Sequence, residues 1–280
     1  MNDYIKSAQL LVEALPYIKK FHNKTIVIKY GGNAMINNEL ENAIIEDITL
    51  LKFVGINPIV IHGGGPDINS ALDIYNIKSE FIDGLRKTTP QAMSIIQQVL
   101  AGKINKNIVG RLNQKGAKAI GLCGIDGNLI TCRPLNEGLG CVGEVKGVNT
   151  KLLTKLTDDE YIPVIAPLGT DSEGNVYNIN ADTAACEIAK SLGAHKLMFV
   201  TNVKGVLDAD ENVIAEINED RINDMIKNGS LSGGMIPKME SSLNAIKNGV
   251  KRVHIIDGHL LHCIILELFT DKGIGTMIKE

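Results

Sequence analysis

The sequence predicts an α/β protein built on a mostly parallel sheet with helices on both faces. Short apolar segments alternate with amphipathic ones along most of the 280 residues, which is the pattern of strands that alternate with helices. Two apolar segments, at 25–30 and 58–62, each end in a glycine-rich turn. The stretch between them is long enough for the helical crossover that joins parallel strands. Ligands of such sheets bind at the carboxyl ends of the strands, where both turns fall.

Residues 4–22 are expected to form an amphipathic helix before the first strand. Apolar side chains recur there at helical spacing in two adjacent stripes: Tyr4, Ala8, Leu11, Leu15 and Ile18, and Leu10, Ala14, Tyr17 and Phe21. Pro16 lies inside the pattern and predicts a kink. This much apolar surface needs a partner, which is either the rest of the same chain or a second subunit.

The first half continues as alternating strands and helices. Its expected elements are strand 25–30, a helix defined by Leu40, Ile44, Ile48 and Leu51, strand 58–62, a helix that begins near Pro66, and helical residues 90–115. Asn38 and Glu41 have the spacing of a capping box at the start of the second of these helices.

The pattern changes in the middle of the chain. Between residues 118 and 150, short strands alternate with glycine turns, which predicts an antiparallel hairpin region at an edge or lid. The α/β pattern then returns, with strands expected at 162–166, 196–201, 252–256 and 274–278 and helices at 181–192, 235–248 and 260–270.

The composition is that of an ordinary globular protein, with 44% hydrophobic and 22% charged residues. A net charge of −3 argues against nucleic-acid binding through a broad basic face. No apolar run approaches the roughly 20 residues of a membrane helix, and the N-terminus resembles neither a signal nor a transit peptide. We therefore expect a cytoplasmic protein with no membrane partner, or one of the plastid stroma if the gene is organelle-encoded. The five cysteines show no C-x-x-C spacing, which predicts reduced thiols and no metal site.

Both glycine-rich turns are predicted anion sites. The first, Gly31-Gly32, follows Lys29, and the second is Gly63-Gly64-Gly65. Glycines between a strand and a helix expose backbone N–H groups, and their entropic cost of about 1 kcal/mol each usually accompanies positive φ or a close ligand. Neither turn matches G-x-G-x-x-G or the Walker A pattern. Lys29 could bridge phosphates or be a surface lysine, and His62 is expected to be structural.

Four further residues are candidates for binding or catalysis. Arg86 has the planar fork that binds a carboxylate, and Asn178 could donate to a substrate. Asp182 follows the expected helix cap Asn180 and could orient nearby lysines. Lys238 follows a glycine pair in the first turn of a helix, where the helix dipole disfavours a cation. Each also has a structural explanation, as a surface cation, a polar strand end or an acid favoured in a first helical turn.

Five motifs along the chain resemble, in order, those of the amino-acid kinase superfamily: Lys29-Tyr-Gly-Gly-Asn-Ala-Met, Val60-Ile-His-Gly-Gly-Gly-Pro, Gly84-Leu-Arg, Asn178-Ile-Asn-Ala-Asp and Gly233-Gly-Met-Ile-Pro-Lys-Met. The resemblance extends over nearly the whole chain and is greatest to the N-acetylglutamate kinase family. It implies a three-layer αβα sandwich in which residues 1–190 bind an acylated amino acid and residues 191–280 bind ATP.

The resemblance also implies a role for each motif. The residues concerned are Lys29, Lys238 and Asp182 for catalysis, Gly64, Gly65, Arg86 and Asn178 for the acylated substrate, and Gly31, Gly32, Gly205 and Leu207 for the nucleotide. The two lysines would stabilise the transferring phosphoryl group, and Asp182 would organise them. Arg86 and Asn178 would bind the α-carboxylate of N-acetylglutamate.

The implied reaction fits these residue types. The γ-phosphoryl group of ATP would pass to the γ-carboxylate of N-acetylglutamate, giving N-acetylglutamyl phosphate and ADP in arginine biosynthesis. A carboxylate nucleophile is already ionised at neutral pH and needs no general base. It needs charge neutralisation and alignment, which lysines, glycine amides and Mg²⁺ supply. Mg²⁺ is expected on the ATP phosphates because the sequence shows no dense carboxylate cage.

The sequence departs from the family pattern in two places. Lys87 and two threonines follow Arg86, where relatives often have an apolar residue and an acid. Asn202 stands where many relatives have aspartate. These departures are expected to shift the affinities for substrate and nucleotide, but they remove no predicted catalytic group.

The two ends of the chain resemble those of arginine-inhibited members. Residues 1–22 resemble an N-terminal helix that interlaces between dimers, which implies a homohexamer built as a trimer of dimers. The C-terminal segment resembles an inhibitor region, with His262, Glu267 and Gly273 as candidate neighbours of an arginine effector. Glu267 could instead lie on a solvated helix face.

Two alternatives remain open. The chain could be another member of the superfamily, acting on aspartate, glutamate, carbamate or uridylate. It could also be a non-catalytic small-molecule sensor on the same fold, although such a sensor would be expected to lack Lys29 or Lys238, and both are present.

Overall fold

The computed structural model describes residues 2–31, 37–231 and 233–280. In chain order the helices are α1 (Asn2–Phe21), α2 (Asn38–Phe53), α3 (Gly65–Ile74), α4 (Pro90–Gln97), α5 (Asn105–Gln114), α6 (Thr150–Asp158), α7 (Ala181–Leu192), α8 (Glu219–Lys227), α9 (Met235–Lys247) and α10 (Cys263–Leu268). A π-helical turn at Gln98–Ile104 joins α4 to α5.

The strands are β1 (Thr25–Tyr30), β2 (Asn57–His62), β3 (Glu80–Ile82), β4 (Leu85–Lys87), β5 (Ala119–Cys123), β6 (Ile130–Pro134), β7 (Gly143–Val148), β8 (Ile162–Ala166), β9 (Leu168–Thr170), β10 (Val176–Asn178), β11 (Lys196–Thr201), β12 (Glu216–Ile217), β13 (Val253–Asp257) and β14 (Thr276–Ile278). Within the described residues, eight of them form the main sheet in the order β12-β14-β13-β11-β1-β2-β8-β5. Every neighbouring pair is parallel except β13 and β14.

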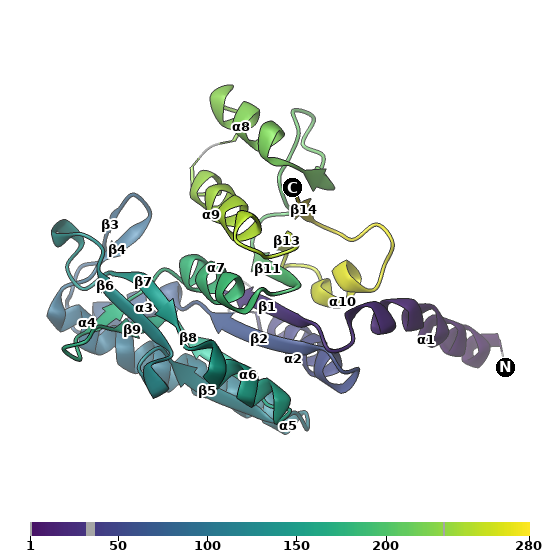
Figure 1. Cartoon of the computed structure of the whole chain (residues 1–280), viewed down its shortest axis with the longest axis horizontal. Helices are drawn as coiled ribbons and strands as arrows, with labels where there is room; N and C mark the ends of the chain where they lie inside the picture. Colours follow the sequence, from purple (N-terminus) through teal and green to yellow (C-terminus); the bar gives the residue numbers. More distant parts are fainter. Residues whose placement is uncertain (1, 32–36, 232) are drawn as a thin grey trace.

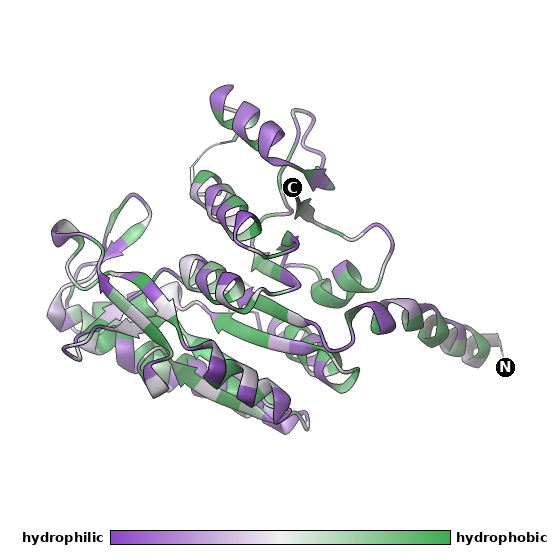
Figure 2. Cartoon of the chain, in the orientation of Figure 1, coloured by the Kyte–Doolittle hydropathy of each residue, from purple (hydrophilic) through white to green (hydrophobic). Residues whose placement is uncertain are grey.

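Helices cover both faces of this sheet, which confirms the predicted three-layer α/β architecture (Figure 1). Alternate residues of the central strands point to opposite faces. Ile26 and Ile28 of β1 pack with α2, α4, α5 and α10 on one face. Val27 of β1 packs with α6, α7, α8 and α9 on the other face, together with Phe199 of β11. The sheet therefore separates two apolar cores, and its strands are strongly apolar (Figure 2).

Several expectations about single elements need correction. Helix α2 is capped by Asn37 and not by Asn38, because Asn37 has an extended backbone and its side chain accepts from the N–H groups of Glu39 and Leu40 at 2.8 and 3.3 Å. The strand that begins at Ala119 is β5, which pairs parallel with β8 at the edge of the main sheet and does not belong to a hairpin.

Other differences concern the ends of the chain and its short elements. The expected helix 260–270 is limited to α10, and β14 is antiparallel to β13. Helix α1 includes Pro16, and the kink expected there remains a prediction. No described helix is long and apolar enough to span a membrane. The sequence did not predict α6, α8 or the β3–β4 hairpin.

A second sheet, in the order β10-β9-β6-β7, lies at the end of the molecule that also holds the β3–β4 hairpin (Figure 1). Helix α1 extends from the body of the molecule in the opposite direction (Figure 1). The region between the main sheet and the second sheet is where the candidate site lies.

Candidate active site

The two glycine turns lie side by side at the carboxyl ends of β1 and β2. Tyr30 and His62, the last residues of these strands, are partners in the parallel register. A Cβ atom added at Gly31 would lie 3.2 Å from the backbone of Gly63 and 3.3 Å from the Lys29 ammonium. The backbones of the two turns are therefore so close that a side chain at Gly31 would require its neighbours to shift. Gly32 lies outside the described residues.

The triple glycine is explained by close packing and not by a left-handed backbone. Gly63, Gly64 and Gly65 do not have the positive φ that three glycines first indicated. A Cβ at Gly64 would lie 2.5 Å from Ile104 and 2.7 Å from Leu100 in the π-helical turn. A Cβ at Gly65 meets nothing within 4 Å, so the N-terminus of α3 faces open space. Its backbone N–H groups are free of side-chain cover, as an anion site requires.

His62 is held in the core and does not face this opening. It is fully buried, its Nδ1–H donates to the Gly63 carbonyl at 2.9 Å, and Nε2 accepts from Asn105 at 3.3 Å. Burial lowers the pKa of His62 to about 4, so the ring is neutral at physiological pH. With both nitrogens occupied, His62 has the structural role that the sequence predicted.

A cavity of about 240 Å³ opens beside the glycine turns. It is lined by Lys29, by Gly63 to Gly65, by Arg86 and by Asn178, with apolar walls from Leu85, Leu100 and Ile179. All four residues expected to hold the acylated substrate therefore border the same space as Lys29. Two cations, a glycine turn and aliphatic carbon line the same space, which suits a small organic acid with an apolar group.

Arg86 is fixed in this cavity by three contacts. Its guanidinium donates to the Ser79 hydroxyl and to the Gly65 carbonyl, the latter at 3.5 Å, and lies 4.6 Å from the centre of the Phe81 ring. Asn178 donates to the Thr88 hydroxyl at 3.2 Å. Burial lowers the pKa of Arg86, but an arginine stays charged at any physiological pH. Arg86 is thus a pre-oriented cation.

Asp182 joins the two lysines that the sequence singled out. Asn180 caps α7 by accepting from the N–H groups of Asp182 and Thr183 at 2.9 and 3.1 Å, which puts Asp182 in the first helical turn. Its Oδ1 lies 3.0 Å from the Lys29 ammonium, and its Oδ2 accepts from Lys238. One carboxylate on α7 thus binds lysines from β1 and α9, which are 209 positions apart in the sequence.

The charge state of Asp182 follows from these contacts. Burial by itself would raise the pKa of the carboxyl, but Lys29 and Lys238 outweigh burial and hold the pKa below its usual range. All three side chains are largely covered, with 14%, 25% and 13% of Lys29, Asp182 and Lys238 exposed. The cluster therefore has two cations and one anion, and its excess positive charge borders the cavity through Lys29.

Two of the four residues expected at the nucleotide lie elsewhere. Gly205 and Leu207 follow the carboxyl end of β11 and are not among the residues that line this cavity. Gly205 has a φ of +146°, and a Cβ there would lie 2.7 Å from the Thr276 hydroxyl, so this glycine is required by the fold. Leu207 is 38% exposed. Both are at the same edge of the sheet as the glycine turns, because β1 and β11 are parallel.

A second cavity, of about 580 Å³, lies between the end of α1 and the C-terminal segment. Glu267 and Gly273 line it, together with Lys20, Lys196, Arg252 and His254. Glu267 is buried and not on a solvated helix face: it accepts from His254 at 2.6 Å and from the N–H groups of Ile274 and Gly275 at 2.8 and 3.1 Å. Gly273, with a φ of +62°, leaves the space that the Glu267 carboxylate fills.

His262 is separated from this cavity, contrary to its expected grouping with Glu267 and Gly273. Its Nδ1 lies 2.7 Å from the fully buried Asp47 carboxylate of α2. Burial raises the pKa of Asp47 to about 6. The half-exposed His262 therefore connects the start of α10 to the buried Asp47 of α2.

Sequence patterns missed two buried polar residues of the second cavity. Lys196 donates to His254 Nε2 at 2.8 Å, and His254 in turn contacts Glu267. The available signal was a lysine and a histidine inside the otherwise apolar segments Lys196–Thr201 and Val253–Asp257.

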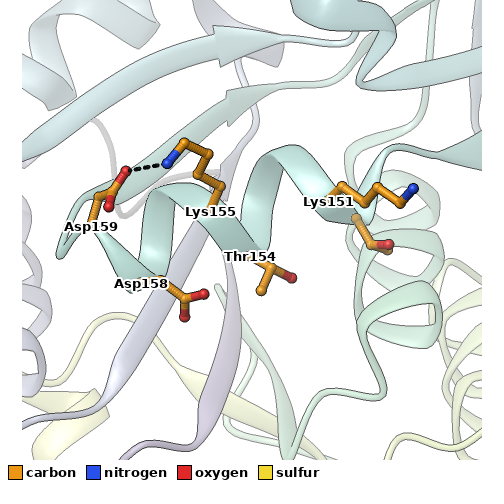
Figure 3. A pocket seen from close by; sticks show the side chains of 6 residues that line it. Lys151, Thr154, Lys155, Asp158 and Asp159 are labelled. Carbon is orange, nitrogen blue, oxygen red and sulfur yellow. Dashed lines mark hydrogen bonds and ion pairs between the residues drawn. The ribbon is translucent and has the colours of Figure 1, made fainter.

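A third hollow, of about 370 Å³, follows one side of α6 (Figure 3). Its side chains are short or charged, and Lys155 pairs with Asp159 at 3.1 Å at the end of the helix (Figure 3). Both partners are mostly exposed, so the pair contributes little stability. No residue that the sequence singled out lies there.

Residues 24–257 match the model of the amino acid kinase family. The chain belongs to this family. Among curated proteins it is 57% identical to the acetylglutamate kinase of Caldicellulosiruptor bescii, over 99% of this chain and 98% of that one. It is 51% identical to the acetylglutamate kinase of Campylobacter curvus over the full length of both. Within the family the chain is therefore a member of the acetylglutamate kinases.

Solved structures agree with this fold. The N-acetylglutamate synthase of Neisseria gonorrhoeae, solved with coenzyme A and N-acetyl-glutamate, superimposes with a TM-score of 0.88 at 25% identity. The match covers 98% of this chain and 63% of the synthase, so this chain spans less than two thirds of that protein. A carbamate kinase of Giardia lamblia, at 17% identity and a TM-score of 0.66, shares the fold.

Proposed function

We propose that this enzyme transfers the γ-phosphoryl group of ATP to the γ-carboxylate of N-acetyl-L-glutamate, giving N-acetylglutamyl phosphate and ADP in arginine biosynthesis. The observation that supports it most is the Lys29–Asp182–Lys238 cluster beside a cavity with a fixed arginine. Two anions must approach each other in this reaction, and the cluster supplies net positive charge where they would meet. The names of the relatives support the choice of substrate.

In this proposal each residue stabilises charge and none removes a proton. The substrate α-carboxylate binds Arg86 and Asn178, and the N-terminus of α3 at Gly64 and Gly65 binds a further acidic or carbonyl oxygen. Lys29 and Lys238 bind the equatorial oxygens of the phosphoryl group, and charge on these oxygens is what lysines stabilise. Asp182 keeps both lysines in position.

The nucleotide is proposed to bind on the other side of this cluster. Gly31 and Gly32 would line the path of the phosphates, and Gly205 and Leu207 would border the nucleotide in a C-terminal half, residues 191–280. Because Asp182 is held by two lysines, the nucleotide phosphates are the proposed ligands of Mg²⁺, which would neutralise their charge.

The decisive experiment measures ADP release by the purified enzyme with Mg-ATP and each of four acceptors: N-acetylglutamate, glutamate, aspartate and carbamate. The proposal predicts a kcat/KM for N-acetylglutamate at least about 100-fold above the others, since Arg86 and the apolar wall recognise both ends of the acylated substrate. Preference for another acceptor would assign the enzyme to a different branch of the superfamily. Turnover with none of them would favour the sensor alternative.

We also propose that arginine inhibits the enzyme by binding the 580 Å³ cavity at Glu267. The buried carboxylate offers a partner for a guanidinium, and Lys20, Lys196 and Arg252 offer partners for an α-carboxylate. Glu267 is ionised: burial would raise its pKa, but His254 and the backbone N–H groups hold the pKa below its usual value.

Glu267→Gln keeps the shape and removes the charge. It is expected to raise the half-inhibitory arginine concentration about 10- to 100-fold and to leave uninhibited kcat unchanged, because a hydrogen bond to a charged group is lost. The control is Glu216→Gln at the rim of the same cavity, where the carboxylate is already paired with Lys279. The measurement is the initial rate as a function of arginine concentration. Equal inhibition of the two variants, or no inhibition of the parent enzyme, would reject the site.

Helix α1 is proposed to join dimers into a hexamer. Leu11, Val12 and Leu15 are 76%, 68% and 46% exposed, and this apolar surface projects from the body of the molecule (Figure 2). Leu11→Glu combined with Leu15→Glu places two charges on one helical face. The expected result in light scattering is a fall from the mass of six chains to that of two, with Glu13→Lys on the same helix as the control. A parent enzyme that is already dimeric would contradict this proposal.

A further inference from the structure

The ammonium group of Lys238 lies over a buried aromatic ring. Its Nζ is 4.6 Å from the centre of the Phe199 ring, within the range of a cation–π contact. Phe199 is fully buried in β11, where it pairs with Lys29 of β1 in the parallel register. Partners in a parallel register point to the same face of a sheet. Phe199, Lys29, Asp182 and Lys238 therefore meet on the face covered by α7 and α9.

Lys238 needs such a contact because α9, its own helix, does not favour a positive charge at this position. It lies in the first turn of α9, where the N-terminal end of the helix dipole repels a cation, and no side chain caps this terminus. The only carboxylate that it contacts among the described residues is Asp182, which is shared with Lys29.

An aromatic ring differs from a second carboxylate in one respect that matters for phosphoryl transfer. A carboxylate at this position would neutralise Lys238 and repel the incoming phosphoryl oxygens. The ring has no net charge, and the attraction of its quadrupole for a cation decreases steeply with distance. It can hold the ammonium group and still leave its charge available to an anion.

We propose that Phe199 is a positioning residue for Lys238, and that its ring face holds the ammonium group where it meets the transferring phosphoryl group. This inference rests on the proposed role of Lys238. Without the ring's attraction, the ammonium group turns away from the transferring phosphoryl group in a larger fraction of the molecules. The consequence is a lower kcat with little change in substrate binding.

Fluorination of the Phe199 ring tests whether its attraction for the Lys238 ammonium group matters, and it changes the packing little. Phe199 is replaced, by site-specific incorporation, with 4-fluoro-, 3,5-difluoro- and 3,4,5-trifluorophenylalanine, which progressively withdraw electron density from the ring face. The expected result is a stepwise fall in kcat that reaches roughly threefold to tenfold for the trifluoro ring. The KM for N-acetylglutamate and the melting temperature should stay close to those of the parent. The same series at Phe269, a partly buried ring of the opposite core, is the control and should leave kcat unchanged.

A second measurement shows whether the ring acts through Lys238. In a Lys238→Met background the fluorinated rings should have no further effect on the residual rate, because the two residues then form a non-additive pair. Three results would overturn the proposal. The kcat of the parent enzyme could stay constant along the Phe199 series, it could fall equally along the Phe269 series, or its fall along the Phe199 series could persist without Lys238. If Lys238→Met itself kept normal turnover, the proposed role of the lysine would fail, whatever the fluorinated series showed.

Discussion

Replacing Lys238 with methionine is expected to lower kcat about 100- to 1000-fold while the KM values for ATP and N-acetylglutamate change less than about threefold. Methionine fills the space of the lysine stem and removes only the charge. Because that charge acts on oxygens that become more negative during transfer, its loss affects the transition state more than the bound substrates. Initial rates at varied ATP and N-acetylglutamate give both parameters.

The control for this experiment lies on the same helix. Lys247 is in the last turn of α9, mostly exposed and paired with Glu219, so Lys247→Met should have no effect on kcat. Near-normal turnover of Lys238→Met would remove this lysine from the mechanism. A large rise in KM with an unchanged kcat would instead make it a binding residue.

Arg86→Ala is expected to raise the KM for N-acetylglutamate about 100-fold and to leave the KM for ATP unchanged. Arg86 is 9% exposed and lines the cavity beside Gly64 and Gly65. Loss of a buried, charge-assisted contact to a carboxylate costs about 2–3 kcal/mol or more. Kinetics with each substrate varied in turn separate the two affinities.

Two companion variants make this result specific. Arg86→Lys keeps the charge but loses the planar fork, so it should recover only part of the affinity. Lys87→Ala removes the next cation along β4, which is exposed at the surface and paired with Glu80, and should behave like the parent. Equal losses for both substrates in Arg86→Ala would indicate a disturbed fold instead of a carboxylate site.

Much of the fold could be predicted because its signals are local. The apolar runs of β1 and β2, the glycines after them and the cap at Asn180 are readable from neighbouring residues. Their consequence, two turns at one edge of a parallel sheet, follows from strand geometry alone. Local signals were misleading where two residues compete for one role, as Asn37 and Asn38 do at the start of α2.

Contacts between distant segments could not be predicted from local patterns. A lysine–histidine–glutamate chain joins β11, β13 and α10, and its members look like isolated polar residues in the sequence. Glu267 and His262 are only five positions apart, yet one borders a cavity and the other binds Asp47 of α2. Glu267 lies within α10, whereas His262 precedes this helix with a left-handed backbone, which the spacing did not reveal.

The sequence alone determined the family, the order of strands and glycine turns, and the residue types available for phosphoryl transfer. The tertiary structure decided which of these residues meet. It joined Lys29 and Lys238 through Asp182, put the ring of Phe199 under the second lysine, and removed His262 from the cavity at Glu267. The physical reason is that the identity of a side chain is a local property, whereas its neighbours depend on how helices from distant parts of the chain pack on one sheet.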